Sequence, residues 1–509
     1  MKLTTYFWCG LLTTLNIIIN AVTRGRVVWL EGRVRRAVFI NWGRRFRYRP
    51  LKFVQPTTEA EIIELLQNAK HVRVFGSAHS FNAGVVTEGT LVSLDKYSGV
   101  IGKDLQKKQL TVRGGTRMRD VIKALHDEGL AFAALPSHDA QSIGGILATD
   151  VHGTGRDWGF VSQSVVRLKI INGKGEVLEC EPADDLFKAA IGGIGAVGII
   201  VEVVVQGVDR FNVAQKVEVA DLAYVEKNLD QLIQENDHVS LYLFPFADKC
   251  QINTWNRTAK RKSWLGPLRE FLTISLDALL AAWMGNLAAY LGFLPAISFL
   301  LYRVKKGSNL VLESNQAFNR TIYHTHQELE FTVPFARTFE LSRRFLARYE
   351  EMYPTRLPYI LLEVRFTPAG HDRTLIGPGQ EQRCTWIDLV CNDSDGFETY
   401  YEAAEKIIKQ VEARPHLGKS CLSWERADFE RMYCERFTRF CQLMAAHDPE
   451  GKFANQFLRQ LFGQKEAVAA LMGLVEVPDV NDGQEGQEQP KEGNGDNLAA
   501  RVRHARLPY

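Results

Sequence analysis

Three glycine-dense segments within about 125 residues restrict the fold of this chain more than any other feature. They are GSAHSF (76–81), SIGGILATDVHGTG (142–155) and GGIGAVGII (192–200). Small residues let the backbone approach a bound group closely, and their N–H groups can surround a pyrophosphate. One such segment is weak evidence, but three together predict a bed for a flat or anionic ligand. The pattern is not G-x-G-x-x-G after a first strand, so it does not indicate a Rossmann site.

Helices and strands alternate around these segments over residues 50–208. The spacing of apolar residues predicts helices at 56–69, 118–131 and 184–193, a hairpin at 164–180 and a buried strand at 198–208. Segment 142–155 is unfavourable both for a helix and for a plain strand. With 509 residues, 46% of them apolar, the chain has enough material for two or three domains. We expect an α+β or α/β architecture.

Several polar residues have two readings when only their spacing is considered. His79 lies in the first glycine-dense segment and is either a hydrogen-bonding residue or a reactive one. Glu363 and Arg365 share one face of the alternating strand LLEVRFTP (361–368), where such neighbours usually form a weak surface ion pair. Lys419, in ARPHLGK (413–419), would ordinarily be a solvated surface lysine.

The order of the motifs resembles the FAD-binding domain of the vanillyl-alcohol-oxidase superfamily. Within it the chain is similar to the aldonolactone oxidase branch: gulonolactone, galactonolactone and arabinonolactone oxidases, with alditol oxidase. The likeness runs from NWGRRFRYRP (41–50) to HDPEGKFANQFLRQLFG (447–463). It implies an α+β fold, with a two-subdomain FAD-binding PCMH-type domain at 46–208 and an α+β substrate (cap) domain at 209–410. A C-terminal segment, 411–465, would return to the flavin.

The resemblance also implies the cofactor and the residues that hold it. His79 is at the position whose histidine is joined to the flavin 8α-methyl group, so FAD is expected to be covalent. Ala78 replaces the usual glycine, and Asp150 and Val151 replace the Gly-Thr of TGTHG, which puts one contact in doubt. No metal is expected. The expected FAD contacts are Gly76, Ser77, Ala78, His79, Ser80, Phe81, Ser142, Gly145, Thr149, His152 and Ile199.

On the substrate side, the resemblance places Glu363 and Arg365 over the flavin, where they bind and orient hydroxyl groups. Lys419 is expected near the flavin N1–C2=O edge, where a cation stabilises the anionic reduced flavin. Ser137 matches a substrate-contact serine. Asp388, in TWIDLVC (385–391), stands where alditol oxidase carries a histidine, which makes a polyol such as xylitol a less secure substrate.

The implied reaction is oxidation of a CH–OH group of a sugar-1,4-lactone or related polyol by hydride transfer to flavin. Glu363 and His152 are the two candidate acceptors of the hydroxyl proton. Oxygen, a quinone or a cytochrome would reoxidise the flavin. Two alternatives stay open: an epimerase-type oxidation of a lipid-linked sugar, and a non-catalytic membrane-associated scaffold.

Two apolar segments suggest membrane association. Residues 6–22, inside an N-terminal region 1–45 with a basic linker, suit an anchor, an interfacial helix, a signal peptide or an ordinary terminal helix. Nine arginines in 24–49 follow it, which by the positive-inside rule keeps the flavin domain cytoplasmic. The insert 271–302, interrupted at Gly292 and Pro295, suits a helical hairpin in the membrane interface, or else a buried helix pair or an oligomer contact.

The remaining composition argues against nucleic-acid binding and against a disulfide or zinc framework. The arginine cluster comes with no nucleic-acid-binding motif, so a nucleic-acid partner is not expected. Eight cysteines without a CxxC pair or zinc spacing indicate free thiols in a reducing compartment. Residues 476–509 begin with an acidic stretch rich in glycine and glutamine and are expected to be disordered.

Overall fold

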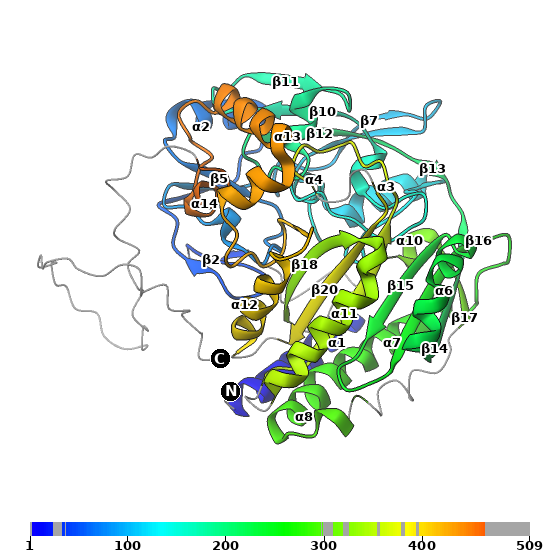
Figure 1. The fold of residues 1–509 in the computed structure, drawn as a ribbon. Coiled ribbons are helices and arrows are strands. Elements are labelled where there is room, and N and C mark those ends of the chain that lie inside the picture. Colours follow the sequence, from blue (N-terminus) through cyan, green and yellow to red (C-terminus); the bar gives the residue numbers. More distant parts are fainter. Residues whose placement is uncertain are drawn as a thin grey trace, which may run out of the picture.

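The predicted FAD-binding domain contains a parallel and an antiparallel sheet (Figure 1). The protein is described here by a computed structural model, which covers residues 3–23, 33–35, 37–296, 298, 309–318, 325–353, 357–377, 382–392 and 396–463. The parallel sheet has the order β4 (Lys52–Val54), β6 (Thr90–Ser93), β5 (Val72–Phe75). The antiparallel sheet has the order β11 (Val177–Cys180), β10 (Val165–Ile171), β12 (Ile199–Gln206), β8 (Gln109–Arg113), β7 (Val100–Asp104). The hairpin predicted at 164–180 is β10–β11.

Helix α2 (Glu59–Asn68) illustrates how local sequence builds this domain. Thr58 caps it by accepting a hydrogen bond from the Glu61 amide (3.2 Å), a role that threonine favours. Ile62 and Leu66 are buried, so one stripe of the helix faces the core. Helices α3 (Met118–Asp127) and α5 (Asp185–Ala190) also fall within their predicted ranges.

The glycine-dense middle segment differs from its prediction, because part of it is helical. Ile143–Ala148 form helix α4, capped by Ser142, whose hydroxyl oxygen accepts a hydrogen bond from the Gly145 amide. A Cβ on Gly144 would lie 3.0 Å from the carbonyl oxygen of Gly114. Close packing on neighbouring backbone therefore outweighs the low helix propensity of glycine here.

The basic segment after the N-terminal helix is structured where it is described. Strands β1 (Arg33–Arg35), β2 (Val38–Ile40) and β3 (Arg47–Tyr48) form a small antiparallel sheet. Phe39 of β2 is fully buried, and its ring packs edge to face on Phe75 of β5. Arg24, Arg26 and Arg36, which belong to the predicted basic linker, lie outside the described residues, as does the tail predicted to be disordered, 476–509.

The predicted cap domain is built on an antiparallel sheet. Helices α6 (Leu222–Glu235) and α11 (Thr338–Met352) cover the face of this sheet that is turned to the viewer in Figure 1, and α12 (Phe397–Ile408) packs beside α11. The strand order is β17 (Asn309–Glu313), β14 (Asn212–Asp221), β16 (Lys249–Thr258), β15 (His238–Leu243), β19 (Ile360–Thr367), β20 (Cys384–Asn392), β18 (His326–Pro334), β21 (Arg414–Pro415).

The end of the described chain returns to the first domain. Helices α13 (Arg426–His447) and α14 (Gln456–Phe462) flank a turn at residues 448–455. In this turn the Lys452 carbonyl accepts a hydrogen bond from the Val72 amide (2.8 Å), and the Asn455 amide group donates to the Ala83 carbonyl (2.9 Å). The domain boundaries at 46, 209 and 411 stay predictions.

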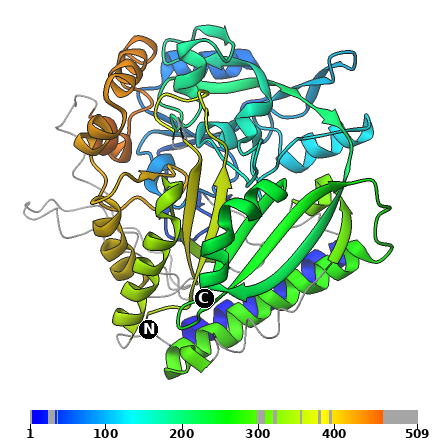
Figure 2. The ribbon, with the colours of Figure 1, turned by 45° about the vertical axis from the view of Figure 1, so that its right-hand side comes forward.

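Two apolar segments from opposite parts of the chain form a helix pair under the cap sheet. Helix α1 (Leu3–Thr23) lies along α7 (Gly266–Leu279), η3 (Leu280–Gly285) and α8 (Asn286–Leu291), as Figure 2 shows. The Trp283 indole donates a hydrogen bond to the Thr14 hydroxyl (3.2 Å). The long helix ends at Gly292, in a left-handed conformation, where the sequence places a break. Residues 297 and 299–302 of the predicted hairpin lie outside the described residues.

By length and composition alone, the 26-residue helix Gly266–Leu291 could cross a membrane, with a mean hydropathy of 1.4, and Phe7–Thr23 is a shorter apolar helix. A third of the apolar window in the longer helix is buried. All eight cysteines lie in the described part of the chain, and all are free thiols, as predicted.

Candidate functional site

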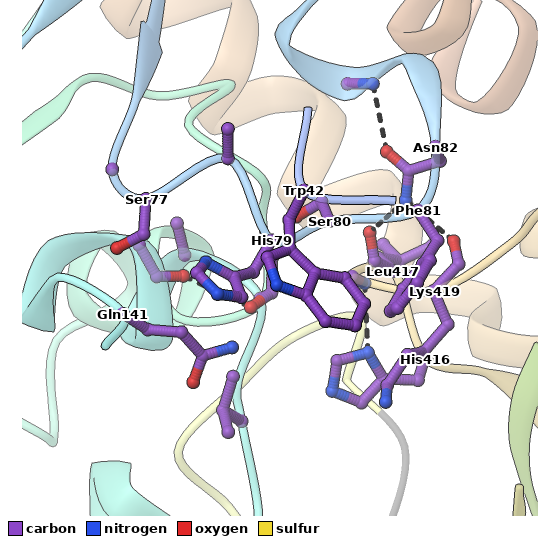
Figure 3. Close-up of a pocket in the computed structure, with 18 of the residues that line it drawn as sticks. Trp42, Ser77, His79, Ser80, Phe81, Asn82, Gln141, His416, Leu417 and Lys419 are labelled. Atoms are coloured by element: carbon purple, nitrogen blue, oxygen red, sulfur yellow. Dashed lines mark hydrogen bonds between the residues drawn. The ribbon is translucent and has the colours of Figure 1, made fainter. Parts of the chain in front are cut away.

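A cleft lies between the glycine-dense loops and the cap sheet. It holds about 1240 Å³ of space, its open mouth included, and a second hollow of about 610 Å³ continues from it past Arg73, Gly76 and Gly145. Figure 3 shows His79 and Ser77 at one part of the cleft and His416 and Lys419 at another. The two hollows together form an elongated site, suited to a ligand longer than a simple metabolite.

The structure brings the predicted site residues together. Ile199 lines the second hollow, and the others line the main cleft. These are Gly76, Ser77, Ala78, His79, Ser80, Phe81, Ser137, Ser142, Gly145, Thr149, His152, Glu363, Arg365 and Lys419.

The first glycine-dense loop keeps a tight shape that needs small side chains. A Cβ on Gly76 would overlap the hydroxyl oxygen of Ser142. Ala78 has φ = 54°, in the left-handed region, and its carbonyl accepts a hydrogen bond from the Trp42 amide (2.7 Å). Such a conformation costs a non-glycine residue roughly 1 kcal/mol. Alanine at this position is therefore accommodated at a cost in stability.

Asp150, which replaces the glycine of the family's TGTHG motif, is held by two polar contacts. Its φ is 48°, which aspartate tolerates better than most residues. One carboxylate oxygen accepts a hydrogen bond from the Ser162 hydroxyl (2.8 Å), and the other lies 2.7 Å from Nε2 of His371. His371 stands in the loop after β19, and both it and Asp150 are buried. The substitution thus ties a loop of the cap domain to the glycine-dense segment.

His79 lies between two aromatic rings. Trp42 stacks on it, with 5.7 Å between ring centroids, and Nε2 of His138 lies 2.8 Å from its own Nε2. Burial lowers the pKa of His79 well below the ordinary histidine value, and it lowers the pKa of His138 to about 4. Both imidazoles are therefore neutral near pH 7.

Three carboxylates lie in one row across the cap sheet. Glu330 of β18 is paired with Asp388 of β20, and Asp388 is paired with Glu363 of β19, so their side chains leave the same face. Like charges directly opposite one another destabilise a sheet. Arg365 offsets them: it contacts Glu330, and its nitrogens lie 3.6 Å from Asp388 and 3.9 Å from Glu363.

Lys419 completes this charge cluster. It forms an ion pair with Glu328, and its Nζ lies 3.4 Å from Asp388 and 3.6 Å from Glu330. Asn82 positions the loop that carries the lysine, because its side-chain amide donates to the carbonyls of Leu417 (2.6 Å) and Lys419 (2.9 Å), as seen in Figure 3.

A proton on Asp388 balances the positive and negative charges of the cluster. Burial, and then the charge of Glu328, raise the pKa of Asp388 well above its usual value. Burial alone would also raise the pKa of Glu330, but the charges of Arg365 and Lys419 outweigh it and hold that pKa well below the usual range. With Asp388 neutral, the two cations match the charges of Glu328 and Glu330.

His152, Glu330 and His416 are buried, and their potential ligand atoms lie within 4.8 Å of one another. Their hydrogen bonds do not suit a metal ion. Nδ1 of His416 accepts a hydrogen bond from the Gly418 amide (2.9 Å), so the proton of this neutral ring is on Nε2. Arg365 already neutralises Glu330. We therefore interpret the three residues as part of a hydrogen-bonded network.

The model of the D-arabinono-1,4-lactone oxidase family matches residues 203–461, half of the chain, and an FAD-binding-domain model matches residues 50–181. The chain belongs to the D-arabinono-1,4-lactone oxidase family. L-gulonolactone oxidase of Mus musculus is 28% identical over 439 residues, covering 83% of this chain and 98% of the relative. L-gulono-1,4-lactone dehydrogenase of Mycobacterium tuberculosis is 27% identical over 440 residues, covering 84% and 99%. D-arabinono-1,4-lactone oxidase of Saccharomyces cerevisiae is 32% identical over 244 residues, covering 45% and 46%.

Solved structures show that this lactone oxidase family member shares its fold with cholesterol oxidases. The cholesterol oxidase of Brevibacterium sterolicum superposes with a TM-score of 0.68 at 16% identity, covering 84% of this chain and 96% of that one. A solvent-stable cholesterol oxidase gives 0.67 at 15% identity, covering 85% and 98%. The predicted α+β fold of the vanillyl-alcohol-oxidase superfamily is confirmed.

FAD is the cofactor of this family member, and the cleft fits it. The glycine-dense loops leave room for a ligand to approach the protein backbone. A Cβ on Gly145 would face only the Ser142 hydroxyl (3.1 Å) and the Gly76 Cα (3.9 Å). Nδ1 of His79 is a buried polar atom that makes no hydrogen bond to a described residue. The second hollow extends the site along α4 and β12, as a dinucleotide requires.

Sequence reasoning missed several residues of this lactone oxidase family site. Glu328 and Glu330 alternate on one strand, HQELEFTVP, and this pattern matches that of Glu363 and Arg365. Their alternation could have flagged them, although only strand pairing shows that they face Lys419. Aromatic lining residues that were also missed include Trp42, His138, His326 and His416.

Proposed function

We propose that this chain oxidises a CH–OH group of a sugar-1,4-lactone by hydride transfer to FAD. The observation that carries the proposal is that Glu363, Arg365 and Lys419 line the same FAD cleft, although they come from two separate segments of the chain. When bound, FAD supplies the acceptor for the hydride. The protein residues then have to hold the substrate, orient its hydroxyl group and receive the hydroxyl proton.

Glu363 is better placed than His152 to receive that proton. Both ring nitrogens of His152 lie close to oxygens, at 2.8 Å from the Gly153 carbonyl and 3.1 Å from Glu330. The carboxylate of Glu363 is partly exposed and lies 3.9 Å from Nε of Arg365. We therefore assign Glu363 as the proton acceptor, and Arg365 as the cation that holds it and a substrate oxygen in place.

The charge balance favours a neutral lactone over the corresponding sugar acid. The cations of the cluster are already matched by Glu328 and Glu330, so a substrate carboxylate would find no unpaired cation there and would face Glu363. Asp388 is buried 3.6 Å from Arg365 and is not among the residues that line the cleft, so it offers a polyol no hydroxyl contact. A lactone therefore fits better than an open-chain acid or polyol. An epimerase or a scaffold role gains no support from these features or from the family.

We further propose that the FAD is attached covalently through His79. The support is its position in the first glycine-dense loop, the stacking on Trp42 and the unpartnered Nδ1. Acid-precipitated protein should retain its flavin, whereas His79→Ala protein should bind FAD but release it in acid. Complete loss of flavin from the wild-type precipitate would contradict the attachment.

We also propose that the helix pair rests on a membrane surface, with the flavin domain on the cytoplasmic side. Leu268, Leu272 and Leu276 are each about half exposed and lie four residues apart on α7, so they form one stripe. Trp264 stands at its start, 91% exposed. Exposed basic residues at 260–262 precede the stripe, which suits anionic lipid headgroups.

Anaerobic reduction of the bound flavin tests the main proposal. Sugar-1,4-lactones should bleach the flavin absorbance, while the corresponding sugar acids and alditols should bleach it far more slowly. Lys419→Ala should slow the reduction by roughly two orders of magnitude, as the loss of one transition-state charge contact does. A flavin that no lactone reduces, or that a sugar acid reduces faster, would contradict the assignment. Oxygen consumption and quinone reduction then identify the acceptor.

A further inference from the structure

A second imidazole lies beside the proposed attachment residue and has no part in the function described so far. His138 is buried in the loop that precedes α4, and its ring meets that of His79 edge to face, with 4.6 Å between centroids. The Nε2 atoms of the two rings are 2.8 Å apart. Since Trp42 stacks on His79 as well, the ring of His79 is held by two aromatic neighbours.

The contact between the two rings requires one hydrogen between the nitrogens. Both rings are neutral, so each carries a single N–H. Nδ1 of His79 and Nδ1 of His138 are buried and make no hydrogen bond of normal geometry to a described residue, although the Ser77 backbone acts to raise the pKa of His79 against its burial. One ring therefore donates from Nε2 and has a bare Nδ1, and the other accepts at Nε2 and carries its hydrogen on Nδ1.

We propose that His138 is a positioning residue for flavin attachment: it accepts the Nε2 hydrogen of His79 and leaves Nδ1 of His79 as the nucleophile. The inference rests on the proposed covalent attachment. In either tautomer His138 occupies the space in front of Nε2, so no flavin carbon can reach that atom. Only Nδ1 is left to form the bond, and it has a lone pair only when His79 donates to His138.

The bond that forms joins Nδ1 of His79 to the flavin 8α carbon. The bonds that break are one C–H of the 8α-methyl group and the Nε2–H of His79. Both hydrogens leave as protons, and His138 takes the one from Nε2. The two electrons enter the isoalloxazine ring and pass to dioxygen, which takes up two protons and leaves as hydrogen peroxide.

The surroundings of His138 suit a base that is neutral before the reaction. Burial, and then the charge of Arg119, lower its pKa to about 4 against the opposing charge of Glu328. His326 and Lys419 are the other charged or titratable neighbours that affect it. His138 should therefore stay able to accept a proton down to about pH 4 to 5.

Attachment can be followed directly, without turnover, in full-length protein produced without flavin. FAD is added, and the acid-stable flavin fraction is measured over time, with total bound FAD measured in parallel. His138→Gln keeps a hydrogen-bonding side chain but not a base, and should form acid-stable flavin about 100-fold more slowly, within the range for general-base loss. Total FAD binding should be unchanged. His71→Gln, at an exposed surface histidine, is the control and should match the wild type.

Two further measurements separate a proton-accepting role from a merely structural one. His138→Ala leaves space for a ring, so added imidazole should speed attachment in this variant. The wild-type rate should be constant from pH 8 to about pH 5 and fall near pH 4. The isolated flavin peptide should show the bond at Nδ1 by NMR.

A bond at Nε2, or a His138→Gln variant that attaches flavin as fast as the wild type, would overturn the inference while the covalent attachment stands. The same holds if imidazole fails to speed the alanine variant. Wild-type protein without acid-stable flavin would instead overturn the attachment itself and the role of His138 with it.

Discussion

Ala78 and Asp150 adopt left-handed backbone conformations where the family pattern has glycine. The contacts that stabilise these conformations differ between the two residues. Asp150 gains hydrogen bonds to Ser162 and His371 that glycine could not make. Ala78 gains no such bond, and only the burial of its methyl group beside Phe39 and Phe75 offsets its conformational cost of roughly 1 kcal/mol. At the scale of single residues, two substitutions that look alike in the sequence are therefore accommodated in different ways, one by apolar packing and one by hydrogen bonds.

We expect Ala78→Gly to leave the protein as stable as the wild type, or to stabilise it by up to about 1 kcal/mol. Relief of the left-handed strain exceeds or matches the entropy that glycine adds to the unfolded chain. Ala124→Gly, inside helix α3, is the matched control and should destabilise by about 1 kcal/mol. Thermal unfolding of the flavin-loaded proteins measures both. Equal losses in the two variants would contradict the expected strain.

Asp150→Gly should restore the family residue and yet destabilise, because His371 loses the carboxylate it contacts. We expect a loss of roughly 1 to 3 kcal/mol, the cost of leaving a buried polar group unpaired. The measurement is again the thermal unfolding midpoint. His371→Leu in the Asp150→Gly background removes the unpaired ring and should recover part of the loss. A fully stable Asp150→Gly variant would show that the buried pair contributes nothing.

At the scale of elements, the row of Glu330, Asp388 and Glu363 joins three neighbouring strands through their charges. Glu330→Gln should destabilise by about 3 kcal/mol, because it removes a charge partner of buried Arg365. Asp388→Asn resembles the protonated form and should leave stability at pH 7 unchanged or raise it, because Asp388 in the wild type must take up a proton on folding. Unfolding measured at pH 7 distinguishes the two, and similar losses would argue against a proton on Asp388.

The pH dependence of Asp388→Asn follows from the raised pKa of Asp388. An acid whose pKa is higher in the folded state stabilises it fully below the unfolded value, 3.8, and this contribution is lost as pH rises through the folded value. Wild-type stability should therefore fall relative to Asp388→Asn between pH 4 and pH 8. A stability difference that does not change with pH would contradict the shift.

The sequence predicts that Glu363 and Arg365 lie together, but it does not predict the rest of this charge cluster, for a physical reason. Alternation along a single strand is local, so it predicts that Glu363 and Arg365 share a face. Glu330 lies in a strand that reaches them only through β20, and no spacing in the sequence states which strands are neighbours. The glycine-dense loops were predictable because close backbone approach demands small residues. The helix inside 142–155 was not, because packing on Gly114 decides it.

At the scale of the whole molecule, the exposed stripe of α7 is the surface we expect to meet a bilayer. Leu272→Glu and Leu276→Glu should each weaken sedimentation with vesicles containing anionic phospholipid several-fold, since each places a charge on the apolar face. Leu105→Glu, at a similarly exposed leucine in the first domain, is the control and should bind as the wild type does. Unchanged vesicle binding in the two α7 variants would contradict the proposed orientation.

The pairing of α1 with α7 to α8 also affects how the chain is made. About 240 residues separate Thr23 from Gly266, and at roughly 5–20 residues per second the ribosome needs roughly 10 to 50 s to add them. During that interval an apolar helix has left the ribosome while its partner does not yet exist. Nascent chains should therefore need a chaperone or a lipid surface to shield α1 until synthesis reaches the insert.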